Sequence, residues 1–534
     1  MADSSPARTS KVSRYDRPDE MFFASCHEDI LYNILRRLPA PSFASAACVC
    51  KTWHRISNQI LSRPLMASAL SLNPSPLDAL LEVLEKVLSE PIRPHFAIVN
   101  VRSDHVLSIM LQHTAKRLGS TTLIIVSRSC GSIGRDASTG EVLEVQGGSD
   151  GVVLTVGFVP GLKVDAFPLR QPRQEPAMLD KLIMDIREFS ASVSGQPVPV
   201  GIMIFGDGRY DLKQATEKLD YAMPMQTAIV GDEGGTFVYQ TADKTRLLRS
   251  NSDHDYNDIA IALTFVRDSN NDHGFGEIKF HVALSEGILA CGPIYKAASV
   301  RRINRATWLT AKREGSQEIL DGERMLMDID EEPGEIMDNC NLYIGVTKRR
   351  RYVIESSEAG FMESLSLHSI FRADEEYLYV EGHGIRTGDR FQFYSPDEAL
   401  AFSTCDKVSA SLERLNLGIP PTSVHQTVPT SASSSFQKEE VFGGYIFSCS
   451  ARKYFSEPLQ DTSPFIKNYP GMPLAGVFCA GEIGRRTSSL SDQNPDGAGS
   501  ASLCSHVFSS IYLVMTYTPP APREAEGWFT EEKK

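Results

Sequence analysis

Apolar residues near the N-terminus recur at helical spacing and predict three short helices. The first is apolar along one face and ends at Pro39 and Pro41, because proline cannot continue a helix. The second is expected to run from Ser42 to Ile60, and the third to begin at Ser75 and Pro76, residues that favour a helix start. The apolar face of the first helix consists of Ile30, Leu31, Ile34, Leu35 and Leu38.

From about residue 95 the pattern changes to short β-rich runs, such as HFAIVNV and TTLIIVS, that alternate with amphipathic helices. A second β-rich region begins near Leu342 and contains a helix from Pro396 to Leu415. The chain has no repeat of solenoid length and no recurring leucine-rich pattern. The expected fold class is therefore α+β or mixed α/β, with a small helical module followed by a two-part body of mixed sheets.

Composition narrows the range of functions. The 534 residues include 67 acidic and 54 basic ones, which gives a net charge of −13. Such a chain is a poor match for nucleic acid or an anionic membrane, because both would repel it. No apolar run approaches the ~20 residues of a membrane helix, and the N-terminus does not resemble a secretory signal. The ten cysteines form no Cys-x-x-Cys pair, which removes the common zinc and thioredoxin-type sites, and we expect no metal and no cofactor. Because the sequence does not indicate secretion, we expect reduced thiols in the cytoplasm or nucleus.

Residues 26–66 carry the sharpest functional signal. The string HEDILYNILRRLP, then Phe43, then VCKTWHRI, resembles an F-box. About 40 residues cannot bury so many large apolar side chains alone, so the module needs a partner surface. The resemblance implies a Skp-type adaptor and, through it, a cullin ubiquitin ligase. It assigns adaptor binding to Ile30, Leu31, Ile34, Leu35, Leu38, Pro39, Val49 and Trp53.

The start of this segment departs from the usual F-box pattern, and a second interpretation of the helices is open. F-boxes usually open with Leu-Pro, whereas Cys26 and His27 stand at that place here, a departure that bears on the strength of adaptor contacts. The alternative is an ordinary helical hairpin packed on the body of the protein.

The rest of the chain resembles the FIST architecture, a two-part domain of sensory proteins and of some F-box proteins. The resemblance rests on short motifs, including Ser129–Ser132, Gly231–Gly235, Phe447–Cys449 and Gly481–Gly484. It implies a module that senses a partner or a small, amino-acid-like ligand, without enzymatic activity. Because mixed sheets usually bind ligands where strands run into loops, the candidate cleft residues are Ser129, Cys130, Gly131, Cys449, Cys479, Glu482 and Gly484. The alternative is that the glycines serve tight turns and the cysteines are buried apolar residues.

These patterns predict the following division: a disordered segment 1–22, the F-box 23–68, a helical linker 69–93, a first FIST-like part 94–297, a second part 298–520 with a disordered insertion 418–437, and a tail 521–534. The leading hypothesis is a non-catalytic substrate receptor of a cullin ubiquitin ligase, whose body recruits an unknown protein target. One alternative is an intracellular small-molecule sensor. Another is a thiol hydrolase that uses Cys449 or Cys479, although no nearby sequence supplies an obvious histidine partner.

Overall fold

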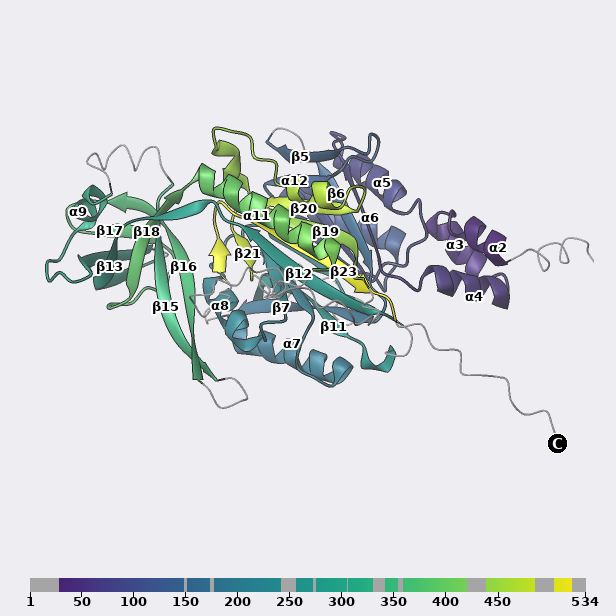
Figure 1. Cartoon of the computed structure of the whole chain (residues 1–534), viewed down its shortest axis with the longest axis horizontal. Helices are drawn as coiled ribbons and strands as arrows, with labels where there is room; N and C mark the ends of the chain where they lie inside the picture. The colour runs from purple at the N-terminus through teal and green to yellow at the C-terminus, as the bar shows by residue number, and fades with distance from the viewer. Residues whose placement is uncertain are drawn as a thin grey trace, which may run out of the picture. The chain divides into compact units, whose positions relative to one another are not determined.

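The computed structural model describes residues 28–147, 151–172, 177–241, 256–271, 275–304, 306–329, 341–353, 359–419, 438–485 and 504–520. The chain forms two compact units, one of residues 1–62 with 88–92 and one of residues 63–87 with 93–534. A helical N-terminal module and a mixed α/β body are both present, as predicted (Figure 1). The predicted disordered segment 1–22, the predicted tail 521–534 and nearly all of the predicted insertion 418–437 lie outside the described residues.

The N-terminal module consists of α2 (Glu28–Leu35), α3 (Ala40–Ala47) and α4 (Lys51–Ile60). The prediction of one helix from Ser42 to Ile60 was wrong, because the chain turns between α3 and α4. Cys50 has extended backbone angles there and forms the N-cap of α4. The turn lets apolar residues of all three helices meet in one small core, made of Leu31, Leu35, Phe43, Ala46 and Ile56.

The segment expected to be a helical linker belongs largely to the body. It contains the end of strand β1 (Leu65–Ser71) and the whole of helix α5 (Pro76–Val87), which begins at the predicted proline. β1 pairs antiparallel with β6, and α5 packs on both strands. The sequence of β1, LMASALS, is too short and too poor in β-branched residues to stand out as a strand.

Three sheets make up most of the body. Sheet A has the order β1, β6 (Val152–Phe158), β2 (Phe96–Val101), β3 (Leu123–Arg128) and β10 (Thr236–Gln240). Sheet B has the order β12 (Glu277–Ser285), β23 (Ser510–Thr518), β19 (Glu440–Cys449), β20 (Leu474–Cys479), β4 (Gly131–Arg135) and β5 (Val142–Gln146). Sheet C has the order β22 (Cys504–His506), β21 (Glu482–Gly484), β9 (Ala228–Asp232), β8 (Gly201–Gly206), β11 (Tyr256–Arg267) and β7 (Leu162–Pro172).

Helices cover one face of each sheet, and the other faces share a core. α5 and α6 (Leu107–Leu118) pack on sheet A, α11 (Glu398–Leu417) and α12 (Ser463–Asn468) on sheet B, and α7 (Leu179–Ser194) and α8 (Lys213–Ala222) on sheet C. Aromatic pairs join the sheets in the shared core. Phe96 of sheet A meets Phe265 of sheet C at 5.2 Å, and Phe205 of sheet C meets Phe447 of sheet B at 6.4 Å between ring centroids.

A closed barrel completes the body. Its strands follow the order β13 (Ile288–Ile303), β14 (Ala306–Arg313), β17 (Leu378–Glu381), β16 (Ala359–Ala373), β15 (Tyr343–Val353) and β18 (Arg390–Pro396), and α9 (Gly322–Met327) contributes to its core. After the barrel, the chain returns and supplies β19 to β23 to sheets B and C. The predicted boundary near residue 297 therefore marks entry into the barrel and not a division between two separate halves. Of the described helices, none combines the length and apolar character needed to cross a bilayer.

Candidate functional sites

The helical module exposes part of its apolar surface. Ile30, Ile34 and Val49 are 53%, 48% and 64% exposed, whereas Leu31 and Leu35 lie in the module core. Leu38 and Trp53 are half-buried beside that core, and Pro39 is exposed. The structure thus divides the predicted adaptor residues into a group that holds the module together and a group that is free to contact another molecule.

The spacing along α2 explains this division. Ile30 and Ile34 are four residues apart and share one face of the helix, while Leu31 and Leu35 share the face toward α3 and α4. The side chains of Glu28 and Arg55 form an ion pair that ties the start of α2 to α4. Large apolar side chains that remain exposed on so small a module are typical of a docking surface.

The predicted cleft residues in the body come together, but they do not line an open cleft. Cys449 of β19 and Cys479 of β20 are paired in a parallel register, and Glu482 of β21 lies opposite Asp232 of β9. Of the predicted residues in this group, only Cys130 is exposed; Ser129, Cys449, Cys479 and Glu482 are buried. We call Asp232, Cys449, Cys479 and Glu482 the acid–thiol cluster.

The two predicted cleft glycines serve close packing. A Cβ atom on Gly131 would lie 2.4 Å from the carbonyl oxygen of Val145, and one on Gly484 would lie 2.3 Å from Cδ1 of Ile511. Neither glycine has a positive φ, so neither is required by a left-handed turn. Both permit neighbouring strands to approach where a side chain would not fit.

Burial determines the charge state of the acid–thiol cluster. It raises the pKa of Asp232 to about 7 and the pKa of Glu482 well above its usual range. Burial also raises the pKa of the Cys449 and Cys479 thiols, and the nearby carboxyl groups add to that effect. The thiols are therefore protonated at neutral pH, whereas a nucleophilic cysteine needs its thiolate. The imidazole of His506, one of the histidines considered as a partner, bonds to the carbonyl oxygen of Gly484 at 3.0 Å.

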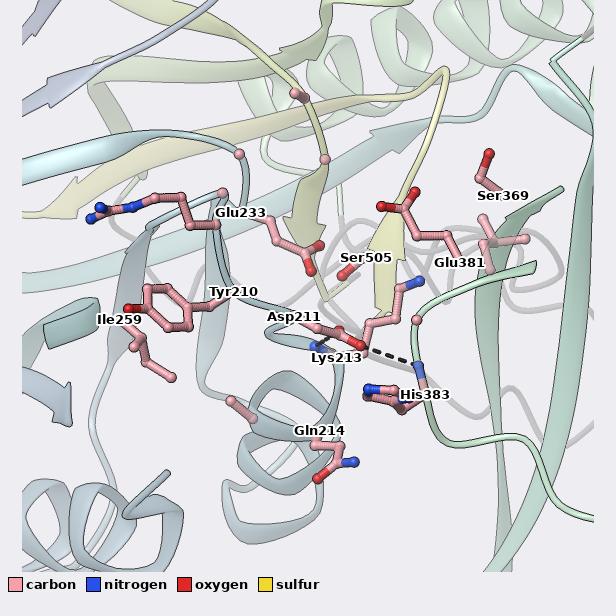
Figure 2. Close-up of a pocket in the computed structure, with 18 of the residues that line it drawn as sticks. Tyr210, Asp211, Lys213, Gln214, Glu233, Ile259, Ser369, Glu381, His383 and Ser505 are labelled. Atoms are coloured by element: carbon pink, nitrogen blue, oxygen red, sulfur yellow. Dashed lines mark hydrogen bonds between the residues drawn. The ribbon is translucent and has the colours of Figure 1, made fainter. Parts of the chain in front are cut away.

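A cavity of about 700 Å³ lies beside this cluster, between the loops of sheet C and the outer face of the barrel. Figure 2 shows its polar end, where Asp211, Lys213 and Glu233 approach Glu381 and His383. Its other end is apolar and is formed by Leu169, Ala177, Leu179 and Ile259. None of these residues is among the site residues predicted from the sequence.

The cavity has the position expected of a ligand site in a mixed sheet. β8 and β9 are parallel neighbours, and the residues that follow them, 208–215 and 233–234, line the cavity. The glycine-rich runs at the ends of these strands were the signal available in the sequence. The predicted cleft residues lie behind one wall, since Ala480 and Gly481, which connect Cys479 to Glu482, are part of the lining.

Asp211 accepts one hydrogen bond within its own loop and one from the barrel side of the cavity. Asp211 Oδ1 accepts a bond from the backbone N–H of Lys213 at 3.0 Å, and Asp211 Oδ2 accepts one from the backbone N–H of His383 at 3.4 Å (Figure 2). Burial raises the pKa of Glu233, while the Lys213 charge opposes that rise. The site can therefore present carboxyl groups and an ammonium group to one ligand. No group of three His, Cys, Asp or Glu side chains within the described ranges is arranged to hold a metal ion.

Comparisons with known proteins support the F-box interpretation of the helical module. The F-box domain model matches residues 25–63. The chain is 38% identical over 541 aligned residues to a protein of Arabidopsis thaliana named as an F-box/LRR-repeat protein, and the match covers 97% of this chain and 98% of that relative. Despite the relative's name, the described residues of this chain form mixed sheets and a barrel and not a stack of leucine-rich repeats. The chain belongs to the F-box protein family.

Proposed function

We propose that the protein is the substrate-recognition subunit of an SCF-type cullin ubiquitin ligase. The F-box binds a Skp-type adaptor, and the FIST-like body recruits a protein target for ubiquitination and degradation. The observation that carries this proposal is the exposure of Ile30, Ile34 and Val49 on a module that matches the F-box family.

The proposal gives the two groups of apolar residues different roles. Ile30, Ile34, Val49 and Pro39 contact the adaptor, whereas Leu31 and Leu35 hold the three helices in place for that contact. The mechanism is proximity, because a bound target has a raised effective concentration near the conjugating enzyme. The protein itself makes or breaks no bond, in keeping with the protonated state of its buried thiols. The complex acts in the cytoplasm or the nucleus.

A co-purification experiment tests the adaptor contact. The intact protein is expected to bind a Skp-type adaptor and, through it, a cullin. The double variant Ile30→Asp and Ile34→Asp is expected to lose both while its circular dichroism spectrum stays unchanged. Met184, which is 58% exposed on α7 of the body, supplies the control variant Met184→Asp. If the double variant binds the adaptor as well as the control does, the proposal is wrong.

The cavity favours a second candidate function, the sensing of an amino-acid-like ligand. Asp211 and Glu381 are placed to attract an ammonium group, and Lys213 to attract a carboxylate. Thermal shift measurements with individual amino acids at millimolar concentration test this candidate. A ligand that raises the melting temperature of the intact protein, but not that of Asp211→Asn, supports it; the absence of any shift across the series contradicts it.

A further inference from the structure

An exposed row of aromatic and arginine side chains crosses the outer face of the barrel. Arg301 of β13 is paired with Trp308 of β14, Trp308 with Tyr379 of β17, and Tyr379 with Arg372 of β16. Residues that are directly paired in neighbouring strands lie side by side on the same face. Four strands thus place two arginines at the ends of a row whose centre is aromatic. We call Arg301, Trp308, Phe371, Arg372, Tyr377 and Tyr379 the aromatic–arginine row.

The rings of this row are in mutual contact. The Trp308 and Tyr379 ring centroids are 5.0 Å apart, and those of Trp308 and Tyr377 are 5.9 Å apart. The Arg301 guanidinium lies 5.3 Å from the centre of the Tyr377 ring, and that of Arg372 lies 5.1 Å from the centre of the Tyr379 ring. Stacked guanidinium groups lose little freedom on binding, because the rings already hold them flat.

Much of the row remains exposed. Phe371 is 53% exposed, Arg301 and Arg372 are exposed, and Trp308 and Tyr377 are half-buried. Tyr379, at the centre of the row, is buried beneath its neighbours. Trp, Tyr and Arg are the residues most enriched where proteins bind one another tightly. The barrel core does not use these side chains, since it is formed by inward residues such as Leu309, Leu378 and Val380.

The two arginines of the row differ in their carboxylate partners. Arg372 forms an ion pair with Asp374 at 3.0 Å, and Asp374 also accepts a hydrogen bond from the hydroxyl of Tyr379 at 2.8 Å. Among the described residues, Arg301 has no such carboxylate partner. One end of the row is therefore an uncompensated cation that would attract an anionic group.

The row is continuous with the cavity. Ser369 of β16 and Glu381 of β17 line the cavity, and Phe371 and Tyr379 lie two residues away from them on the same strands. On β17, Tyr379 and Glu381 point to the same face because they are two residues apart. On β16 the register shifts between Ile370 and Arg372, and the Phe371 ring lies on that same face, 6.2 Å from the Tyr379 ring between centroids. The same outer face of β16 and β17 therefore forms the wall of the cavity and the floor of the row.

We propose that the aromatic–arginine row binds a segment of the target protein in which an acidic residue lies close to an aromatic or large apolar side chain. The apolar side chain packs on Trp308 and Phe371, and a carboxylate pairs with Arg301. This inference rests on the proposed function, for which it names the recruiting surface and the chemistry of the target.

Single-stranded nucleic acid is the other class of molecule that binds aromatic and arginine side chains. Here Asp374 lies within the row, Glu375 and Glu376 follow it, and the whole chain carries a net charge of −13. These negative charges repel a continuous phosphate backbone more strongly than a single carboxylate placed at Arg301. The charges therefore favour a peptide.

Fluorescence anisotropy with defined peptides tests the proposal on the full chain. One labelled probe alternates Glu with Phe, and a second alternates Lys with Phe. The Glu probe is expected to bind and the Lys probe is not. Arg301→Glu is expected to weaken the Glu probe at least about tenfold, the effect of a lost charge-assisted contact, and to gain binding of the Lys probe. Phe371→Ser is expected to weaken the Glu probe without this exchange.

Arg390→Glu is the control, because Arg390 is an exposed arginine of β18, a strand that contributes no residue to the row. Three results would each overturn the proposal. The first is equal affinity for both probes, the second is an Arg301→Glu protein that binds the probes as Arg390→Glu does, and the third is an oligouridine probe that outcompetes the Glu peptide. Adaptor binding is measured on the same variants. If the wild-type chain does not bind the adaptor, the proposed function alone is refuted. If the chain binds the adaptor but shows no peptide selectivity, only this inference is refuted.

Discussion

Glu482 on β21 stands directly opposite Asp232 on β9, so two buried carboxyl groups share one pair of strands. Gly234 N–H donates to Asp232 Oδ1 at 2.8 Å, which gives that group a partial compensation. Burial still raises its pKa to about 7, and the pKa of Glu482 is raised well above its usual range. The pair is best accommodated with its protons on, because two charges here would repel each other in a medium that solvates neither.

Asp232→Asn is expected to stabilise the body at pH 8. Between pH 4 and 7 the folded protein holds a proton on Asp232 that the unfolded chain has lost, so this group lowers stability as pH rises through that window. Asparagine carries no charge and keeps the acceptor for Gly234. The free energy of unfolding at pH 8 should rise by about 2–4 kcal/mol, the equivalent of the pKa shift, with little change at pH 4. Urea titrations at both pH values check this, with the exposed Glu188→Gln on α7 as control.

Arg485→Met is expected to destabilise the body strongly. The Arg485 guanidinium is buried, pairs with Asp220 at 2.8 Å and donates to the carbonyl oxygen of Pro224 at 2.6 Å. Removal of the arginine leaves the Asp220 carboxylate buried without its cation, which costs about 3–5 kcal/mol. Thermal unfolding measures the loss. Because Asp220→Asn removes the stranded charge, the double variant should recover part of the stability, and a double variant weaker than Arg485→Met would contradict this account.

Gly131→Ala is expected to destabilise sheet B by about 1–3 kcal/mol. The added methyl group would meet the Val145 carbonyl oxygen and the Phe478 ring, and backbone atoms of a paired strand cannot move aside readily. Gly151→Ala is the control, because its new methyl group would meet the flexible side chain of Leu72 at 3.1 Å. Chemical denaturation of the two variants should separate them, and equal stability would show that β4 and β5 tolerate a wider spacing.

Leu35→Ala is expected to open the F-box while Ile34→Ala leaves it folded. Leu35 is fully buried in the module core, and truncation of such a leucine costs about 2–5 kcal/mol, whereas exposed positions usually change stability by less than about 0.5 kcal/mol. Hydrogen exchange of amides in α2, α3 and α4 measures the stability of this unit separately from the body. Comparable exchange in both variants would contradict the assignment of Leu35 to the core.

Local pattern was sufficient to predict the first helix, the start of α5 and the mixed α/β character of the body. It failed at Cys48–Cys50, where the apolar pattern continues although the chain turns. The turn is explained by packing, because it brings Phe43 and Ile56 into one core. It also missed β1, whose pairing with β6 is a contact between distant parts of the chain. Such contacts leave no periodic trace in either segment.

The site predictions also failed where they depended on contacts between distant parts of the chain. The motifs around Cys449, Cys479 and Glu482 did converge in space, but their burial depends on how sheets B and C pack, and the sequence does not state it. The cavity residues Asp211, Glu233 and His383 come from loops of two different sheets. The loops that follow β8 and β9 do meet at a cavity, but only the topology shows which strand ends lie together.

The position of β23 has a consequence for biosynthesis. This strand is the last of the described chain, yet it lies inside sheet B between β12 and β19. The sheet therefore cannot close on a ribosome until nearly the whole chain has been made, whereas the F-box needs only its first helices. A chain cut short before Ser510 would carry the F-box without a completed body. If the proposed function holds, such a chain occupies the adaptor while it delivers no target.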